Sequence, residues 1–371
     1  MAWLSGWNKR IKVTVDCGNV DANLTHFPVL LYLSTSSGSG SDDVSAVFDE
    51  VGANSKKIAV TKDDGTTQCY VQIEKWDLGN EKAWLWTSLS SLVLSSSVDT
   101  ILYLYFDNSR ADNDAYVAVK DTATARNVWN AQYKTVQDMA DASSPIVGST
   151  TNGLDGTEGG SPTYQQAGQI AYAVYLTKLV GDGFNFGNPA ALRPAHVTLS
   201  FWTKTTDYTR SLNGGIAYGA VFGDVNAYGY KVNFHESEAH LHISDGSSHY
   251  GLAVAIGDNL FHHWALTFDE QVVRAYKDGA EAAGSPVTAA VSISYPSGGA
   301  DVFMIGMRAD GQYGLGGTID DVRVSSANRG GAWIKAENHA GRDTLIKDYA
   351  AMELYSAPRH GFTMFQDPGI V

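Results

Sequence analysis

Short strand-like segments separated by turn residues are the feature that most constrains the fold of this 371-residue chain. Residues 10–16 alternate apolar and polar side chains, which predicts a half-exposed strand, and residues 27–33 form a nearly continuous apolar run, which predicts a buried one. Residues 57–61 and 67–73 flank an Asp-Gly step, whose glycine allows the positive φ of a hairpin turn. The series continues to about residue 116 without a convincing helix. We therefore predict a β-sandwich for this part of the chain.

A second series of strand-like segments follows a Ser-, Thr- and Gly-rich stretch at 127–162. Its members lie at 198–205, 228–235, 239–244, 261–268, 271–277, 287–294, 302–307 and 318–325. Only residues 333–339 have a helix-like composition. Short strands at this close and fairly regular spacing are typical of a jelly roll. We therefore expect an all-β chain of two tandem β-sandwiches, of which the second is a jelly roll.

The composition is sufficient for two hydrophobic cores. Apolar residues make up 44% of the chain, and the aromatic residues comprise 19 Tyr, 13 Phe and 9 Trp. The length also suits two domains of about 100–200 residues each. We expect the first sandwich at residues 1–126, the jelly roll at 127–345 and an irregular C-terminal docking tail at 346–371.

Charge and hydropathy exclude two classes of partner. The formal net charge of −14 repels the phosphate backbone of nucleic acid and anionic lipid surfaces. The sequence contains no run of eighteen apolar residues, so we expect no membrane span. Its first ten residues lack the basic and apolar segments of a signal peptide, so we expect no export by that route.

The two cysteines, Cys17 and Cys69, fall in separate predicted strands of the first half. A bridge between them is sterically conceivable, but nothing in the spacing indicates one. We favour two free thiols.

Three sequence motifs in the second half of the chain carry a family resemblance. They are Asn-Leu-Phe-His-His-Trp-Ala-Leu-Thr-Phe at 259–268, Ala-Tyr-Lys-Asp-Gly at 275–279 and Gly-Thr-Ile-Asp-Asp-Val-Arg-Val at 317–324. In this order and spacing they resemble the laminin-G-like, concanavalin A-like jelly-roll superfamily. The resemblance covers roughly residues 127–345 and implies a lectin-like fold for them.

The first half resembles a β-domain family that is known only as a domain of unknown function and that often precedes such jelly rolls. The resemblance rests on the stretches at 10–13, 27–31, 70–77 and 102–108. It supports the predicted architecture, and it implies no chemistry.

Catalysis by a glycoside hydrolase of this superfamily would need paired carboxylates on one face of a strand. Glu236 and Glu238 are the nearest such pair, but they lie between two predicted strands and fit a polar hairpin turn better. Asp320 and Asp321 are adjacent, so on a regular strand they should point to opposite faces. We therefore expect no catalytic residues.

Six of the ten histidines lie between residues 235 and 263. His240 and His242 are two residues apart, so a strand would place both on one face, where they could be two ligands of a metal site. His235 or His249 on a neighbouring strand would supply a third ligand. Solvent-facing histidines on hairpins are common, and we favour that interpretation.

The family resemblance implies two kinds of binding residue. Calcium at the rim of the sandwich would take Asp320 as a ligand, although the Phe-Asp-Gly-type turn that usually contributes reads Gly-Phe-Asn-Phe-Gly-Asn at 183–188. Flat aromatic rings at strand ends and in Gly-rich loops could stack on sugars. The candidates for carbohydrate binding are Tyr208, Tyr218, Tyr228, Tyr250 and Tyr313.

From these observations we expect a non-enzymatic virion surface protein, such as a bacteriophage capsid decoration, head fibre or tail component, with a lectin-like module for carbohydrate or host-surface binding. An outward-facing module without an export signal fits a protein released by lysis. Its expected partners are other virion proteins, contacted through the termini, and a cell-surface glycan or receptor, with the chain present as a homo-oligomer or in many copies. The alternatives are a polysaccharide-degrading glycoside hydrolase of the same fold and a bacterial surface lectin.

Overall fold

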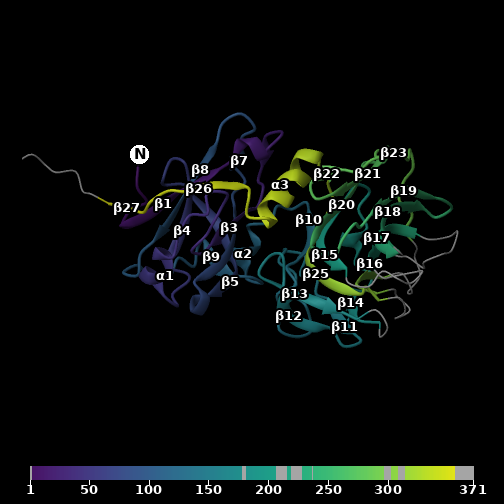
Figure 1. Ribbon diagram of the computed structural model, residues 1–371, viewed down its shortest axis with the longest axis horizontal. Coiled ribbons are helices and arrows are strands. Elements are labelled where there is room, and N and C mark those ends of the chain that lie inside the picture. Colours follow the sequence, from purple (N-terminus) through teal and green to yellow (C-terminus); the bar gives the residue numbers. More distant parts are fainter. Residues whose placement is uncertain are drawn as a thin grey trace, which may run out of the picture.

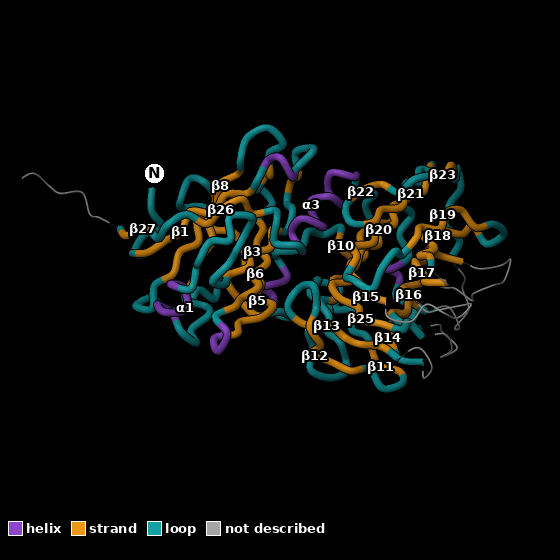
Figure 2. Tube along the Cα trace, in the orientation of Figure 1, coloured by secondary structure: helices purple, strands orange, loops and turns teal. Residues whose placement is uncertain are grey.

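The computed structural model describes residues 2–177, 181–205, 215–218, 228–235, 237–295, 302–307 and 314–355, and it shows two β-sandwiches side by side (Figure 1). Strands dominate both halves of the described chain, and its few helices are short (Figure 2). The predicted all-β fold is therefore confirmed.

The first sandwich contains one continuous path of strands in the order β26-β1-β8-β4-β5-β6-β3, with β9 paired to β5 and β27 paired to β1. Its N-terminal elements are β1 (Lys9–Val15), β2 (Leu24–Thr25), β3 (Val29–Leu33), α1 (Ala46–Val51), β4 (Ile58–Lys62), β5 (Gln68–Asp77), β6 (Lys82–Ser88), β7 (Val93–Leu94), β8 (Thr100–Phe106), β9 (Val117–Val119) and α2 (Ala123–Arg126). Single 3-10 turns lie at Cys17–Asn19 and Leu78–Asn80. Alternate residues of the longer strands are buried in the core of this sandwich.

The predicted hairpin at the Asp-Gly step joins β4 to β5. The Lys62 amide donates to the Thr67 carbonyl at 3.0 Å, which closes the turn. Gly65 has a φ of +75°, and a Cβ at this position would lie 2.2 Å from the Ala2 carbonyl oxygen. Glycine is therefore required both by the turn and by the N-terminal segment that packs against it.

The C-terminal segment returns to the first sandwich. Helix α3 (Gly331–Gly341) lies between the two sandwiches, and β26 (Ile346–Tyr349) and β27 (Glu353–Leu354) then pair antiparallel with β1 (Figure 1). The strands differ from the irregular tail that we predicted from residue 346. Their short, mixed sequences carry no strand pattern, and their pairing depends on the edge that β1 offers.

The second sandwich consists of two antiparallel sheets. Its elements are β10 (Tyr133–Gln137), β11 (Thr157–Gly159), β12 (Thr163–Ala167), β13 (Tyr172–Leu176), β14 (Gly183–Asn185), β15 (Val197–Thr205), β16 (Gly215–Tyr218), β17 (Tyr228–His235), β18 (Glu238–Asp245), β19 (His249–Ala255), β20 (His262–Phe268), β21 (Val272–Lys277), β22 (Ala280–Glu281), β23 (Val287–Thr288), β24 (Phe303–Ile305) and β25 (Gly317–Ser325), with a 3-10 turn at Ala190–Leu192. One sheet has the order β12-β13-β25-β15-β20-β21-β22, with β10 and β23 at its side, and the other has the order β11-β14-β24-β16-β17-β18-β19. Apolar residues from both sheets form the core between them.

The outer face of the β15–β25 sheet packs against the first sandwich. Trp202 and Tyr276 from this sheet belong to the same buried cluster as Trp333 of α3 and Trp86 of β6. Each of these side chains is no more than 6% exposed. We call this contact the seam. It leaves the opposite sheet, which contains β17, β18 and β19, facing away from the first sandwich (Figure 1).

A β-bulge in β25 corrects our prediction that Asp320 and Asp321 point to opposite faces. On the facing strand β15, Ser200 pairs with Arg323 and Trp202 pairs with Asp320, so one residue of β15 opposes two of β25. Asp321 has a φ of +47°, which absorbs the extra residue. Ile319 and Val322 both face the core, and both carboxylates consequently lie on the seam side.

Candidate functional site

Polar side chains line the outer face of the sheet formed by β17, β18 and β19. On β17, Tyr230, Val232 and Phe234 belong to the core of the sandwich, so the residues between them point away from it. The same alternation applies to β18, whose residues Ala239, Leu241 and Ile243 are core residues. The outward set, which we call the histidine face, is Lys231, Asn233, His235, His240, His242 and His249.

Strand register places these residues in two adjacent rows. Asn233 lies directly opposite His240, and Lys231 lies directly opposite His242. The imidazole rings follow one another along the face, with centroid separations of 5.5 Å from His235 to His240 and 5.7 Å from His240 to His242. The sequence-based expectation that His240 and His242 share one face of a strand is therefore confirmed.

Beyond His249, the edge strand β19 contributes almost no side-chain volume to this face. Gly251 lies opposite His242, and Ala253 lies opposite His240. A Cβ at position 251 would lie 1.9 Å from the Leu241 carbonyl oxygen, so only glycine fits there. The imidazole rings therefore lie beside a strand with small side chains, and this part of the face is open to solvent because Ala253 and Ala255 are exposed.

Burial controls the electrostatics of the histidine face. Desolvation lowers the pKa of Lys231 to about 8. Desolvation also lowers the pKa of His242 to about 3, and the nearby Lys231, His240 and His249 lower it further. His242 is consequently neutral at physiological pH, with one ring nitrogen that donates a hydrogen bond and one that accepts.

Asn233 is the most deeply buried member of the histidine face. Its side-chain oxygen is buried and has no hydrogen-bond partner among the described residues. Its residue as a whole is 3% exposed. The opposite residue, His240, is more accessible, with a quarter of its side chain exposed and its Nε2 3.7 Å from a Glu238 carboxylate oxygen. Exposure therefore increases from β17 toward β19.

The histidines form a row and do not converge on one point. In the described part of the chain, the only set of three or more His, Cys, Asp or Glu side chains whose donor atoms all lie within 4.8 Å of one another is Asp16, Cys17 and Asp99. That set is partly exposed, and Asp99 already accepts from Lys347 at 2.9 Å. A metal site among the histidines would therefore need side-chain rearrangement.

Of the five tyrosines predicted to contact carbohydrate, the structure describes the side chains of Tyr228 and Tyr250, and both lie at the Asp245 end of β18. Tyr250 packs partly buried against the core and donates its hydroxyl to Asp245 at 3.1 Å. Tyr228 begins β17 on the core side of the sheet and is partly exposed. Tyr208 and Tyr313, and the side chain of Tyr218, lie outside the described residues, as does Glu236.

Asp320, the predicted calcium ligand, is fully buried in the seam. Its Oδ2 accepts the Ile170 amide at 2.8 Å, and its Oδ1 is buried without a partner among the described residues. Desolvation raises the pKa of Asp320 well above its ordinary value. Calcium requires six to eight oxygen ligands, and the described acidic side chains do not converge here. These residues do not fit a calcium site as they stand, and calcium at Asp320 stays a prediction.

Its neighbour Asp321 forms the central ion pair of the seam. Arg323 donates from Nε to Oδ1 at 2.9 Å, and its Nη2 lies 2.7 Å from Oδ2. The Arg323 guanidinium also lies 4.4 Å from the centroid of the Trp86 ring, which belongs to the first sandwich. Arg323 therefore links the two sandwiches, and the buried Asp320 and Asp321 carboxylates are inaccessible to a substrate.

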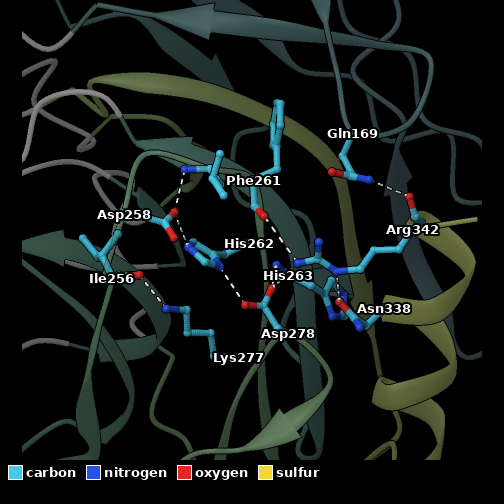
Figure 3. A network of polar contacts seen from close by, with 12 residues as sticks. Gln169, Ile256, Asp258, Phe261, His262, His263, Lys277, Asp278, Asn338 and Arg342 are labelled. Atoms are coloured by element: carbon cyan, nitrogen blue, oxygen red, sulfur yellow. Dashed lines mark hydrogen bonds and ion pairs between the residues drawn. The ribbon is translucent and has the colours of Figure 1, made fainter. Parts of the chain in front are cut away.

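A second polar network ties α3 to the jelly roll (Figure 3). His262 lies between two carboxylates, with Nδ1 2.7 Å from Asp278 and Nε2 3.1 Å from Asp258. Arg342, just beyond α3, donates to the other oxygen of Asp278 at 2.7 Å. We interpret this network as a structural clasp.

Sequence reasoning found the histidines and missed Lys231 and Asn233. Both lie in a strand that was predicted with its observed bounds, residues 228–235. The alternation of apolar Tyr230, Val232 and Phe234 with polar residues was the available signal, because it assigns Lys231 and Asn233 to the same face as His235.

The comparison with family models identifies a domain in the second sandwich. A family model described as the concanavalin A-like lectin/glucanases superfamily matches residues 180–335. No curated protein matches the chain. In the part of the chain that the structure describes, no helix is long and apolar enough to cross a membrane.

Solved structures with a similar fold include domain 4 of AbnA, an extracellular arabinanase from Geobacillus stearothermophilus, in complex with arabinotriose. It is 17% identical with a TM-score of 0.43, and the match covers 55% of this chain and 97% of that one. The receptor-binding domain of botulinum neurotoxin mosaic serotype C/D is 14% identical with a TM-score of 0.41, and the match covers 56% of this chain and 50% of that one. The chain thus spans about half the length of the neurotoxin domain. Together with the two-sheet architecture, the family match places a domain of the concanavalin A-like lectin/glucanases superfamily at residues 180–335.

Proposed function

We propose that the chain is a non-enzymatic glycan-binding protein and that the histidine face is its contact surface. The observation that carries this proposal is the pair of Asn233 and His240 on neighbouring strands of a lectin-like sandwich. An amide and an imidazole each offer hydrogen-bond donors and acceptors, which are the groups that sugar hydroxyls require.

The surroundings of this pair support the proposal. A buried amide oxygen without a partner costs free energy, and a ligand hydroxyl that donates to Asn233 would recover it once the surrounding side chains open a path to that oxygen. The small residues Gly251 and Ala253 of β19 leave room for a flat ring beside His240 and His242. Small-molecule sites commonly combine apolar surface with a few fixed polar groups.

The described residues of the histidine face do not include the pair of carboxyl groups that glycoside hydrolysis requires. Hydrolases of this type use two carboxyl groups about 5–9.5 Å apart. Glu238 is the one carboxylate that the described part of the face offers, and it is half-exposed at the start of β18. The adjacent Asp320 and Asp321 are buried in the seam, where no polysaccharide can reach them.

We further propose that the chain displays this module in many copies on the surface of a virion. The outward-facing lectin-like fold supports this setting, and the seam supports it by holding the second sandwich in a fixed orientation on the first. Co-sedimentation of the native chain with virions is the expected result. Recovery of the chain only from cell envelopes would instead support a bacterial surface lectin.

A panel of immobilised glycans, probed with the intact chain, tests the binding function. We expect saturable binding to at least one glycan and no release of reducing sugar from any of them. Binding to none of the panel would contradict the proposal. Robust release of reducing sugar that is abolished by Glu236→Gln or Glu238→Gln would replace it with the hydrolase.

A further inference from the structure

We propose that the first sandwich carries a separate binding site, a pocket that takes one carboxylate-bearing sugar unit such as a uronic acid. The pocket has a volume of about 260 Å³. It lies between the N-terminal segment, the start of β5 and the loop that follows β8. Its lining includes Leu4, Trp7, Gln68, Arg110, Asp112 and Asn113. The site goes beyond the histidine face, since no residue is shared between the two.

Arg110 gives the pocket its preference for an anion. Its guanidinium forms no ion pair with a described residue, and its Nε is buried without an acceptor among them. Asp112, the acidic residue of the lining, is already 3.5 Å from the Lys56 ammonium. A buried charged donor without an acceptor is costly, and a carboxylate is the group that matches a guanidinium with two parallel hydrogen bonds.

The Arg110 guanidinium lies close to Gly6 and Trp7 of the N-terminal segment. Gly6 has a φ of +79°, and a Cβ there would lie 2.6 Å from Nη1 of Arg110. On the other side, the guanidinium carbon is 5.9 Å from the centroid of the Trp7 ring, which is buried. The backbone of Arg110 is anchored because its amide donates to the Asp107 carbonyl at 3.1 Å, and its guanidinium lies beside the N-terminal segment before a ligand arrives.

Two amides of the lining are oriented for sugar hydroxyls. Asn113 donates from Nδ2 to the Ile58 carbonyl at 3.0 Å and to Gln68 Oε1 at 2.8 Å. This arrangement leaves the Gln68 amide nitrogen as a donor and the Asn113 oxygen as an acceptor, neither with a partner among the described residues. Ligand pockets usually measure about 300–1,000 Å³, so this smaller one suits a single ring.

Saturation-transfer NMR titration of the full chain tests the site with D-glucuronate and D-glucose, which differ in one carboxylate. We expect glucuronate to bind at least tenfold more tightly than glucose. Arg110→Gln should weaken glucuronate binding at least tenfold and leave glucose binding unchanged. Lys82→Gln, which removes an exposed cation of the same sandwich, is the matched control and should change neither affinity.

A second variant, Ala111→Trp, fills the pocket from its exposed rim without removing a polar group. It should abolish glucuronate binding while the unfolding curve stays that of the wild type. Three results would overturn the proposal: no saturable binding of glucuronate to the folded wild type, equal affinity of wild type and Arg110→Gln, or equal affinity for glucuronate, acetate and inorganic phosphate. The last result would mean an adventitious ion only.

Discussion

Asn233 on β17 and His240 on β18 lie directly opposite each other, with both side chains on the outer face of the second sandwich. Cross-strand pairs of this kind have Cβ atoms about 4.5–5.5 Å apart. An amide and an imidazole are therefore held side by side by the register of two regular strands. Such rigid support favours a defined binding geometry over an adaptable one.

The Arg323–Asp321 pair should be among the most important contacts for stability. Arg323→Met leaves the Asp321 carboxylate buried and unpaired, so we expect the free energy of unfolding to fall by about 3–5 kcal/mol. Urea unfolding measures this change. Arg274→Met removes the cation of a pair with Glu281 that is about one-third exposed, and this control should cost less than about 1 kcal/mol. Equal effects of the two substitutions would contradict the assigned role of the seam.

The clasp around Asp278 should make stability depend on acid pH. Burial alone would raise the pKa of Asp278, but hydrogen bonds from His262, the His263 amide and Arg342 outweigh it and lower the pKa to about 2 (Figure 3). The folded pKa is below the unfolded value of 3.8, so this stabilisation is complete above that value and is lost as the pH falls toward 2.

The side chain of Asp278 is 32% exposed, so solvent screening reduces the effect to about 1 kcal/mol. Between pH 5 and pH 2.5, wild type should lose about that much more stability in urea unfolding than Asp278→Asn does. Parallel losses in the two proteins would show that Asp278 does not have this role.

The returning C-terminal strand should stabilise the first sandwich. Tyr349 of β26 is 4% exposed and belongs to its core, so Tyr349→Ala should cost about 3–5 kcal/mol and speed amide exchange in β1. Tyr355, six residues later, is 46% exposed. Tyr355→Ala should cost less than about 1 kcal/mol. A small effect of Tyr349→Ala would mean that β1 is stable without its partner.

The two thiols should differ in reactivity. Both cysteines are free, and burial raises the pKa of Cys69 to about 12, whereas Cys17 is partly exposed and its pKa is raised mainly by a hydrogen bond with Asp99. Because the thiolate is the reactive form, a thiol reagent at pH 8 should modify Cys17 slowly and Cys69 only after unfolding. Mass spectrometry counts the labels. Rapid labelling of both in the native protein would contradict the burial of Cys69.

Local pattern made much of the fold predictable. The Asp-Gly hairpin at Gly65, the strand Tyr228–His235 and the helix within Gly331–Gly341 each carry a signal in their own residues. Features that depend on partners escaped prediction. The strand β26 forms because β1 offers an edge, and the bulge at Asp321 is specified jointly by β25 and the facing β15.

The candidate site was predictable only in part. Alternation identified one face for His240 and His242, but it could not show that Asn233 and His240 face each other, because cross-strand register depends on the turn between the strands. Likewise, Asp320 is buried because the first sandwich packs on the second, and no local sequence pattern predicts that contact.

The most direct test of the proposed function is a titration with the glycan that wild type binds most tightly, comparing the Asn233→Ala/His240→Ala double variant with wild type. His196→Ala, which removes a half-exposed histidine of the same sandwich away from the histidine face, is the control. We predict that the double variant stays folded and loses at least tenfold in affinity, about 1.4 kcal/mol or more, while the control binds as wild type does. A folded double variant with wild-type affinity would contradict the assignment of the histidine face as the glycan contact.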